Sequence, residues 1–108
     1  LQPQHFFQVC VMEYNLQRLG ECEGHLQQLL GLPGIDTDTL QLADQQGRPV
    51  PVTLRSAALN LAGLTLRDRK EYDKALQLFD EALKASPSNQ FAAQNAEQLR
   101  KALAPRKE

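Results

Sequence analysis

The chain has 108 residues, with 12 Lys and Arg against 13 Asp and Glu and a formal net charge of −1 at pH 7, which fits one small domain. Nucleic-acid binding depends on clustered basic residues, so a composition without basic excess argues against a nucleic-acid-binding protein. The apolar runs are far shorter than the roughly 20 residues that cross a bilayer, so we expect no membrane insertion. The sequence starts at Leu1 without a leader pattern, which indicates a fragment or processed chain.

The two cysteines do not form the dense disulfide framework of a small secreted domain. We therefore expect reduced thiols and a cytoplasmic location. His5, Cys10, Cys22 and His25 would supply four zinc ligands, but the close-spaced ligand pairs of structural zinc sites are missing. Since each of these residues also fits an apolar helix face, we expect core or interface residues, with neither metal nor cofactor.

The first third of the chain has a helical pattern. Apolar residues from Phe6 to Leu30 recur at steps of three and four. Gly20 follows the first periodic run, and glycine at such a place is a common helix stop. The pattern predicts an antiparallel pair of helices over residues 3–19 and 22–31, and the second ends before Pro33.

Residues 33–53 break this periodicity. Three apolar residues within 40–43 favour one short helical turn, and the glycine and prolines within 47–51 predict an extended exit. A structureless loop of this length is uncommon in a compact domain. We therefore predict a connecting insertion or loop that is ordered on a helix face, functional or mobile.

The second half is helical again. Its periodic apolar residues predict a helix from Thr53 to about Arg69 and another from Tyr72 to Ser86. A final helix is expected over 90–103, capped by Ser88 or Asn89 and followed by a frayed polar tail over 105–108.

Residues 56–89 carry the most informative spacing. Small residues, one aromatic residue and one proline recur at the positions of the tetratricopeptide signature, namely Leu59, Gly63, Ala75, Phe79, Ala82 and Pro87. This stretch resembles the tetratricopeptide repeat family. Gly63 and Ala75 lack bulk where paired helices cross, and Phe79 fills the groove toward the neighbouring helix. Leu66 replaces an aromatic residue, and Lys70 stands where the turn commonly has glycine.

Residues 6–32 resemble the repeat less closely. Aligning Gly20 with Lys70 places Glu13 opposite Gly63 and His25 opposite Ala75, so larger polar groups would occupy the close helix crossing of a degenerate first repeat. The two registers then start 50 positions apart instead of about 34, which attributes roughly 16 residues to the insertion. Residues 90–103 would form a capping helix or half repeat.

The resemblance implies an all-α fold over residues 1–108, with antiparallel helix pairs stacked as a short right-handed superhelix. In such arrays the first helices line a groove for a peptide or partner helix. The groove-facing candidates by register are Phe7, Cys10, Tyr14, Gln17, Asn60, Leu64, Arg67, Phe91, Gln94, Gln98 and Lys101. Plain surface or core packing is the alternative for each of them. We expect a protein-binding scaffold within a larger multiprotein assembly, and self-association through the end helices stays open.

Within the same fold, a co-chaperone that holds the acidic C-terminus of a chaperone is an alternative. The inner positions that match its clamp are Cys10, Tyr14, Leu61, Phe91 and Asn95. None of these side chains is basic, so a bound carboxylate would have no cationic partner. The clamp is therefore not indicated.

An enzyme is the alternative from another class. Its candidate groups are scattered carboxylates together with His5, Cys10, Cys22 and His25, all on segments with a helical pattern. Catalysis needs such groups to converge in a pocket, and the sequence has no phosphate-binding or cofactor-binding motif. We therefore do not expect an enzyme.

Overall fold

The computed structural model describes residues 2–43 and 46–103; the expected tail over 105–108 lies outside them. The helices are α1 (Pro3–Asn15), α2 (Leu19–Leu30), α3 (Leu54–Asp68), α4 (Tyr72–Ala85) and α5 (Gln90–Leu103), and the strands are β1 (Thr39–Ala43) and β2 (Pro49–Thr53). The chain is thus predominantly helical, and the all-α expectation is corrected by a two-stranded antiparallel sheet in the described region. In these same residues, no helix has the length and apolarity that a bilayer crossing requires.

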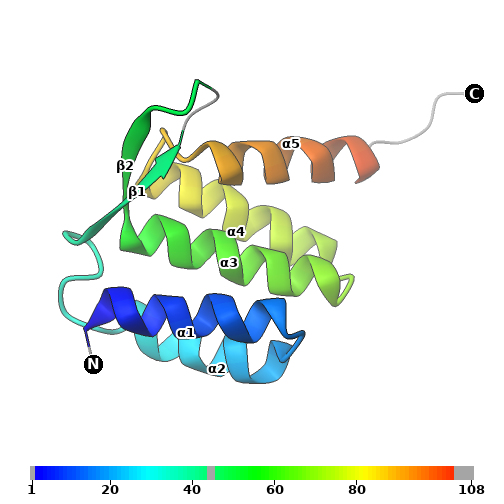
Figure 1. Cartoon of the computed structure of the whole chain (residues 1–108). Coiled ribbons are helices and arrows are strands. Elements are labelled where there is room, and N and C mark those ends of the chain that lie inside the picture. Colours follow the sequence, from blue (N-terminus) through cyan, green and yellow to red (C-terminus); the bar gives the residue numbers. More distant parts are fainter. Residues whose placement is uncertain (1, 44–45, 104–108) are drawn as a thin grey trace, which may run out of the picture.

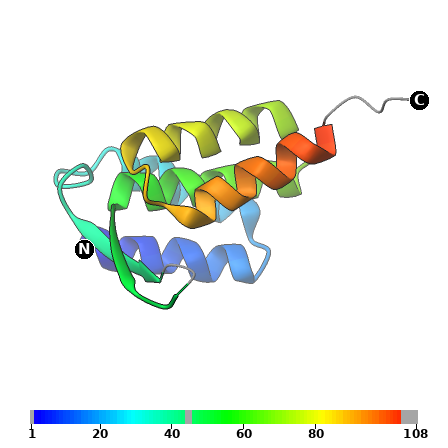
Figure 2. The ribbon, with the colours of Figure 1, turned by 90° about the horizontal axis from the view of Figure 1, so that it is seen from above.

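The helices form two layers. Helices α1, α3 and α5 lie on one side of the molecule, and α2 and α4 lie behind them (Figures 1 and 2). Helices α1 and α2 pair with each other and both contact α3, whereas α5 packs mainly on α4. The predicted order of helix pairs is therefore present, with α5 added at the end.

The break between α1 and α2 falls at residues 16–18, so the predicted stop at Gly20 is wrong and this glycine lies inside α2. The turn is made by Gln17, whose φ of 62° matches the 66° of Lys70 in the turn between α3 and α4. The residues that follow match as well, with φ −88° and ψ 66° at Arg18 against −93° and 71° at Glu71. The two matching turns are therefore 53 positions apart, from Gln17 to Lys70, whereas the predicted alignment set Gly20 against Lys70 at a separation of 50.

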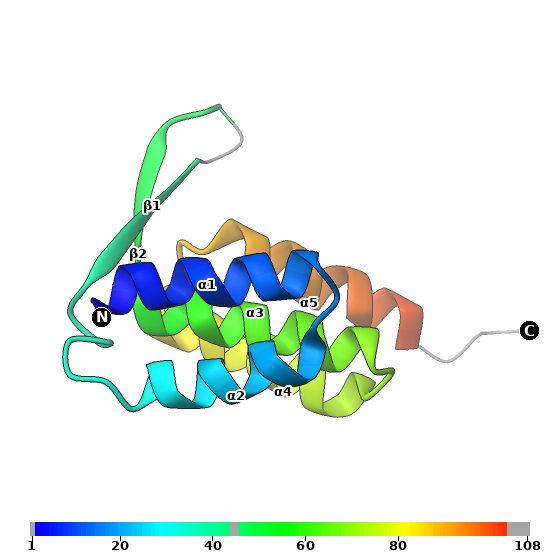
Figure 3. The ribbon, with the colours of Figure 1, turned by 60° about the horizontal axis from the view of Figure 1, so that its bottom comes forward.

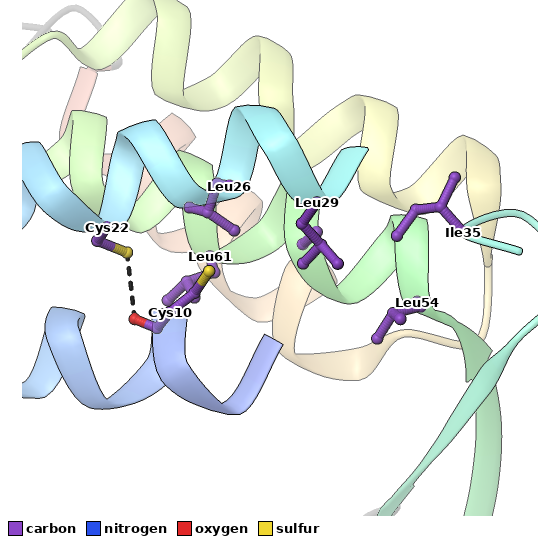
Figure 4. Packing of buried hydrophobic residues seen from close by; sticks show 8 residues of the cluster. Cys10, Cys22, Leu26, Leu29, Ile35, Leu54 and Leu61 are labelled. Carbon is purple, nitrogen blue, oxygen red and sulfur yellow. Dashed lines mark hydrogen bonds between the residues drawn. The ribbon is translucent and has the colours of Figure 1, made fainter. Parts of the chain in front are cut away.

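This corrected register places Cys10 at the position of Gly63 and Cys22 at that of Ala75. Both cysteines are fully buried, and the Cys22 thiol donates a hydrogen bond to the Cys10 carbonyl at 3.2 Å (Figure 4). The close crossing of α1 and α2 is thus made by two small thiol side chains. The expectation of Glu13 and His25 at this crossing is wrong, and these two side chains bond to each other at 2.8 Å (Oε1 to Nδ1).

The main apolar core lies between α1, α2 and α3. Figure 4 shows Leu26 of α2 and Leu61 of α3 beside the two cysteines, with Leu29, Leu54 and Ile35 further along the same cluster. The buried members of this cluster are Cys10, Cys22, Leu26, Leu29, Ile35, Leu54, Ala58 and Leu61. Apolar burial across three helices fixes the first helix pair on α3.

The crossing of α3 and α4 is closer still. A Cβ atom built on Gly63 would lie 2.5 Å from Cε1 of Phe79, a distance at which the ring would have to move. Ala75, Phe79 and Ala82 are fully buried, and Leu59 packs with Ala82. The predicted lack of bulk at Gly63, where the paired helices cross, is confirmed, and the ring that approaches it is that of Phe79.

Asn89 joins three helices. Its Oδ1 accepts the Ala92 N–H at 3.1 Å, which caps α5, and its Nδ2 donates to Ser56 Oγ at 2.9 Å. The Ser56 hydroxyl donates in turn to the Ala82 carbonyl at 2.7 Å. Of the two predicted caps, Ser88 and Asn89, it is Asn89 that forms the capping hydrogen bond to the first turn of α5. Pro87 is exposed between α4 and α5.

The predicted insertion contains the β-hairpin. The helical turn expected over 40–43 is wrong, because Leu40 pairs with Val52 and Leu42 with Val50 in an antiparallel register. The extended exit through the prolines is confirmed by β2. Val52 is buried and Leu40 packs against the main core, whereas the far end of the hairpin projects away from the helices (Figure 3).

Candidate partner-binding surfaces

The layer of α1, α3 and α5 presents a polar cluster at the end of α3. The Tyr14 hydroxyl donates to Asp68 Oδ2 at 2.8 Å, and Arg67 Nη2 donates to the Tyr14 oxygen at 3.4 Å. Burial, together with the Asp68 carboxylate, raises the pKa of Tyr14, so the phenol stays neutral and acts as a donor. The cluster links α1 to α3.

A second polar contact links α3 to α5. Asn95 Nδ2 donates to Asn60 Oδ1 at 2.9 Å. Beside this pair lies a hollow of about 340 Å³ lined by Arg67, Tyr72, Asn95, Gln98, Leu99 and Ala102. This arrangement offers hydrogen-bonding groups around a small depression.

Several predicted groove residues meet in this layer. Arg67 contacts Tyr14 and shares the hollow with Gln98, and Asn60 reaches the hollow through Asn95. Phe91 is 49% exposed on α5. Gln17, Gln94 and Lys101 are exposed as well, and among the residues that the structure describes no contact brings them together with Phe91 into one site.

Other predicted groove residues lie in the core. Cys10 is fully buried, so its selection as a binding residue is wrong; the three-position register error assigned it to the groove. Leu61, considered for the chaperone clamp, is 5% exposed. Phe7 and Leu64 are half-buried and pack against the main core, so a partner could reach only parts of their side chains.

A second hollow lies on the other layer, between α2 and α4 with α3 as its floor. It has a volume of about 580 Å³. Most of its wall is apolar, formed by Leu26, Leu30, Leu59, Ala62, Leu66 and Leu78. We call this hollow the α2–α4 groove.

Two apolar rows run along the α2–α4 groove. Leu26 and Leu30 are one turn apart on α2, and Leu59, Ala62 and Leu66 follow steps of three and four along α3. Residues at these steps share one helix face. Apolar side chains therefore line the groove along its length.

The charged residues of the α2–α4 groove are Glu23, Arg69 and Glu71. Arg69 Nε donates to Glu23 Oε2 at 2.8 Å, which joins α2 to the end of α3. Glu71 Oε1 lies 3.3 Å from Lys74 Nζ. Each carboxylate of the groove is therefore paired with a cation, and these four residues together carry no net formal charge.

Sequence reasoning missed the α2–α4 groove. Leu59 was singled out only for the repeat signature, and Leu30, Leu66 and Leu78 were treated as helix periodicity. The available signal was the width of the apolar arc on α4, where Leu76, Leu78 and Phe79 cover more than one face. A helix that packs on one neighbour needs a narrower stripe.

The thiols and histidines do not form a reactive centre. Burial raises the pKa of Cys10 to about 12 and that of Cys22 to about 11, so both thiols stay protonated near neutral pH. His5 is exposed at the start of α1, away from the buried thiols. Within residues 2–43 and 46–103, no three His, Cys, Asp or Glu side chains are placed to hold a metal ion.

Comparisons of the chain with protein families, curated proteins and solved structures give no match.

Proposed function

We propose that this chain is a tetratricopeptide-like helical-repeat module that binds a helix of a protein partner, as one segment of a larger assembly. The repeat proposal is supported by the matching turns at Gln17 and Lys70. It is also supported by small residues at equivalent crossings, Cys10 with Cys22 and Gly63 with Ala75. The hairpin between α2 and α3 accounts for a separation longer than the usual repeat of about 34 residues.

The α2–α4 groove is the observation that carries partner binding. Leu26 and Leu59 in its wall are buried, whereas Leu30, Ala62, Leu66 and Leu78 are half-buried and keep part of their surface uncovered. Uncovered apolar surface of this kind marks interaction sites. The rows on α2 and α3 run along the helices, which suits an amphipathic helix laid lengthwise in the groove. Apolar residues of that helix at steps of three, four and seven would meet Leu30, Leu66 and Leu78.

The charged residues of the groove, Glu23, Arg69 and Glu71, lie together near the end of α3. Glu23 is paired with Arg69 and Glu71 with Lys74. Both carboxylates thus already have a cationic partner, so apolar contact would select the partner helix.

The face formed by α1, α3 and α5 is a weaker candidate for a carboxylate ligand. Its half-buried cation, Arg67, already contacts Tyr14 and Asp68. A ligand carboxylate would have to compete with Asp68 for that guanidinium. The α2–α4 groove therefore takes precedence over a chaperone-type clamp.

The groove is tested by filling it. Ala62→Leu adds three carbon atoms to the groove floor, and Ala93→Leu makes the same change on the exposed face of α5. Both proteins are checked for helical circular dichroism and used with the wild type for affinity capture and crosslinking from cell extract. We expect a stoichiometric partner that Ala93→Leu retains and folded Ala62→Leu loses. Equal capture by both variants, or no partner for the wild type, would contradict the proposal.

A second variant separates occlusion from misfolding. Leu78→Gln removes apolar surface from the groove wall without adding bulk. We expect weaker capture for this variant too, with its thermal unfolding still cooperative. A partner lost by Ala62→Leu but fully retained by Leu78→Gln would indicate local distortion at α3 instead of binding in the groove.

A further inference from the structure

The β-hairpin has one blocked edge and one open edge. At its base the Leu54 N–H donates to the Asp38 carbonyl at 2.8 Å, which fixes the alternation of the ladder. Even-numbered residues along both strands therefore point their backbone groups at the opposite strand, and odd-numbered residues point theirs outward. Two outward bonds agree with this assignment: Thr53 N–H to Ser86 Oγ at 2.9 Å and Ser88 Oγ to the Pro51 carbonyl at 3.2 Å.

Prolines close the outer edge of β2. Pro49 and Pro51 are both outward residues in the register, and proline has no N–H to donate. An added strand needs donors and acceptors in alternation, so it cannot pair along this edge. The prolines leave the inner ladder intact, because Val50 and Val52 supply its bonds.

The outer edge of β1, formed by the backbone groups of Thr39, Gln41 and Ala43, has no such block. Charged side chains and prolines commonly protect an edge strand from pairing with another chain. The β1 sequence Thr-Leu-Gln-Leu-Ala contains neither. Among the described residues, the hydrogen bond made to this edge runs from Gln4 Nε2 to the Thr39 carbonyl, and at 3.4 Å it is long. Gln41 thus presents an N–H and a carbonyl ready for pairing.

We propose that the outer edge of β1 pairs with the same edge of a second copy of this chain. A two-fold axis at Gln41 makes the pairing antiparallel, so that each Gln41 donates its N–H to the carbonyl of the other. Thr39 then lies opposite Ala43 of the second copy. In such an isologous contact the same residues of both copies face each other. Because residues 39–43 carry no charged side chain, the strand sets no like charges opposite each other.

The apolar face of the hairpin continues across this junction. Leu40, Leu42, Val50 and Val52 point to one side of the sheet by the period of two. Leu42 and Val50, near the hairpin end, are half-buried, and the proposed register places Leu42 beside Leu40 of the second copy. Two-stranded hairpins are marginal in water, and three or more strands with an apolar face are stable. Pairing supplies a sheet of four strands, and the hairpin end that projects from the helices (Figure 3) gives the second copy access.

The test measures self-association and locates it. Sedimentation of the wild type from micromolar to millimolar concentration is expected to show a reversible dimer, weak because a strand pair buries less than a standard interface. In the same range, hydrogen exchange of the Gln41 amide should slow with concentration by a larger factor than exchange of the Leu40 amide, which is already bonded within the hairpin of the monomer.

Two variants at one position decide the register. Gln41→Pro removes the outward N–H, as Pro51 does on β2, and should weaken dimerisation at least tenfold with helical circular dichroism unchanged. Gln41→Thr keeps the N–H and should dimerise like the wild type. A wild type that stays monomeric at millimolar concentration overturns the proposal. So does a dimer that Gln41→Pro retains, since it would use another surface such as the exposed Met12 and Leu16 of α1.

Discussion

The packing of Gly63 against Phe79 gives a sharp test, because the chain offers a matched glycine. Gly24 is inside α2 with no atom within 4 Å of an added Cβ, whereas a Cβ on Gly63 would lie 2.5 Å from the Phe79 ring. Alanine is favoured over glycine in a helix interior by about 1 kcal/mol. Gly24→Ala should therefore raise the free energy of unfolding by up to about 1 kcal/mol.

Gly63→Ala receives the same propensity gain but must displace a fully buried ring. Overpacking of this kind costs about 1–3 kcal/mol, and the short approach to several ring atoms favours the upper part of that range. We expect a net loss of about 1–2 kcal/mol. The two alanine variants should thus move the unfolding transition in opposite directions.

Urea and thermal denaturation followed by circular dichroism measure both changes. For a domain of about this size, 1 kcal/mol corresponds to roughly 4–8 °C in Tm. If Gly63→Ala were as stabilising as Gly24→Ala, the proposed close crossing of α3 and α4 would be wrong. In the double variant of Gly63→Ala with Phe79→Leu, the total loss should be smaller than the sum of the two single losses, since residues in contact give non-additive changes.

Three further changes test other parts of the fold. Asn89→Ala should cost about 1–3 kcal/mol, because it removes the α5 cap and leaves buried Ser56 without its donor, whereas Ser88→Ala should stay within about 0.5 kcal/mol; urea midpoints measure both. Phe79→Ala should cost about 3–5 kcal/mol and abolish cooperative unfolding. The raised thiol pKa values favour protonated thiols in the folded state, so stability should be full below about pH 9 and fall toward pH 12. Cys22→Ala should reduce that pH dependence in urea titrations, and an unchanged slope would contradict it.

The helices could be predicted because their signals are local. Apolar periodicity depends on which residues share a face, and the packing of Gly63 with Phe79 follows from a small residue facing a large one. The capping role of Asn89 also follows from residue type. Helix periodicity and capping are decided within one or two turns of chain, whereas the roles of Gly63 and Phe79 were predicted from the spacing of the repeat signature.

The hairpin and the repeat register were missed for identifiable reasons. Leu40 and Leu42 alternate with polar residues as Val50 and Val52 alternate with prolines, a period of two that was available in the sequence. The turn at Gln17 contains neither glycine nor proline, so sequence reasoning placed the helix boundary at Gly20. This choice shifted the alignment of the first helix pair on the second by three positions.

The binding surfaces depend on tertiary geometry. The α2–α4 groove exists because α2 and α4 both contact α3 and leave a hollow between them. No residue pattern within either helix determines that separation. The burial of Cys10 likewise depends on how closely α1 approaches α2, which the sequence pattern alone left open.

The turns at Gln17 and Lys70 have strained backbone conformations, so the protein could be made more stable at these two positions. A residue with a Cβ in the left-handed region costs roughly 1 kcal/mol relative to glycine, and both turns have such a residue. Lys70→Gly would relieve this strain at an exposed position outside the α2–α4 groove and the β1 edge. An engineer could therefore stabilise the protein there to compensate for destabilising changes introduced at either proposed interface.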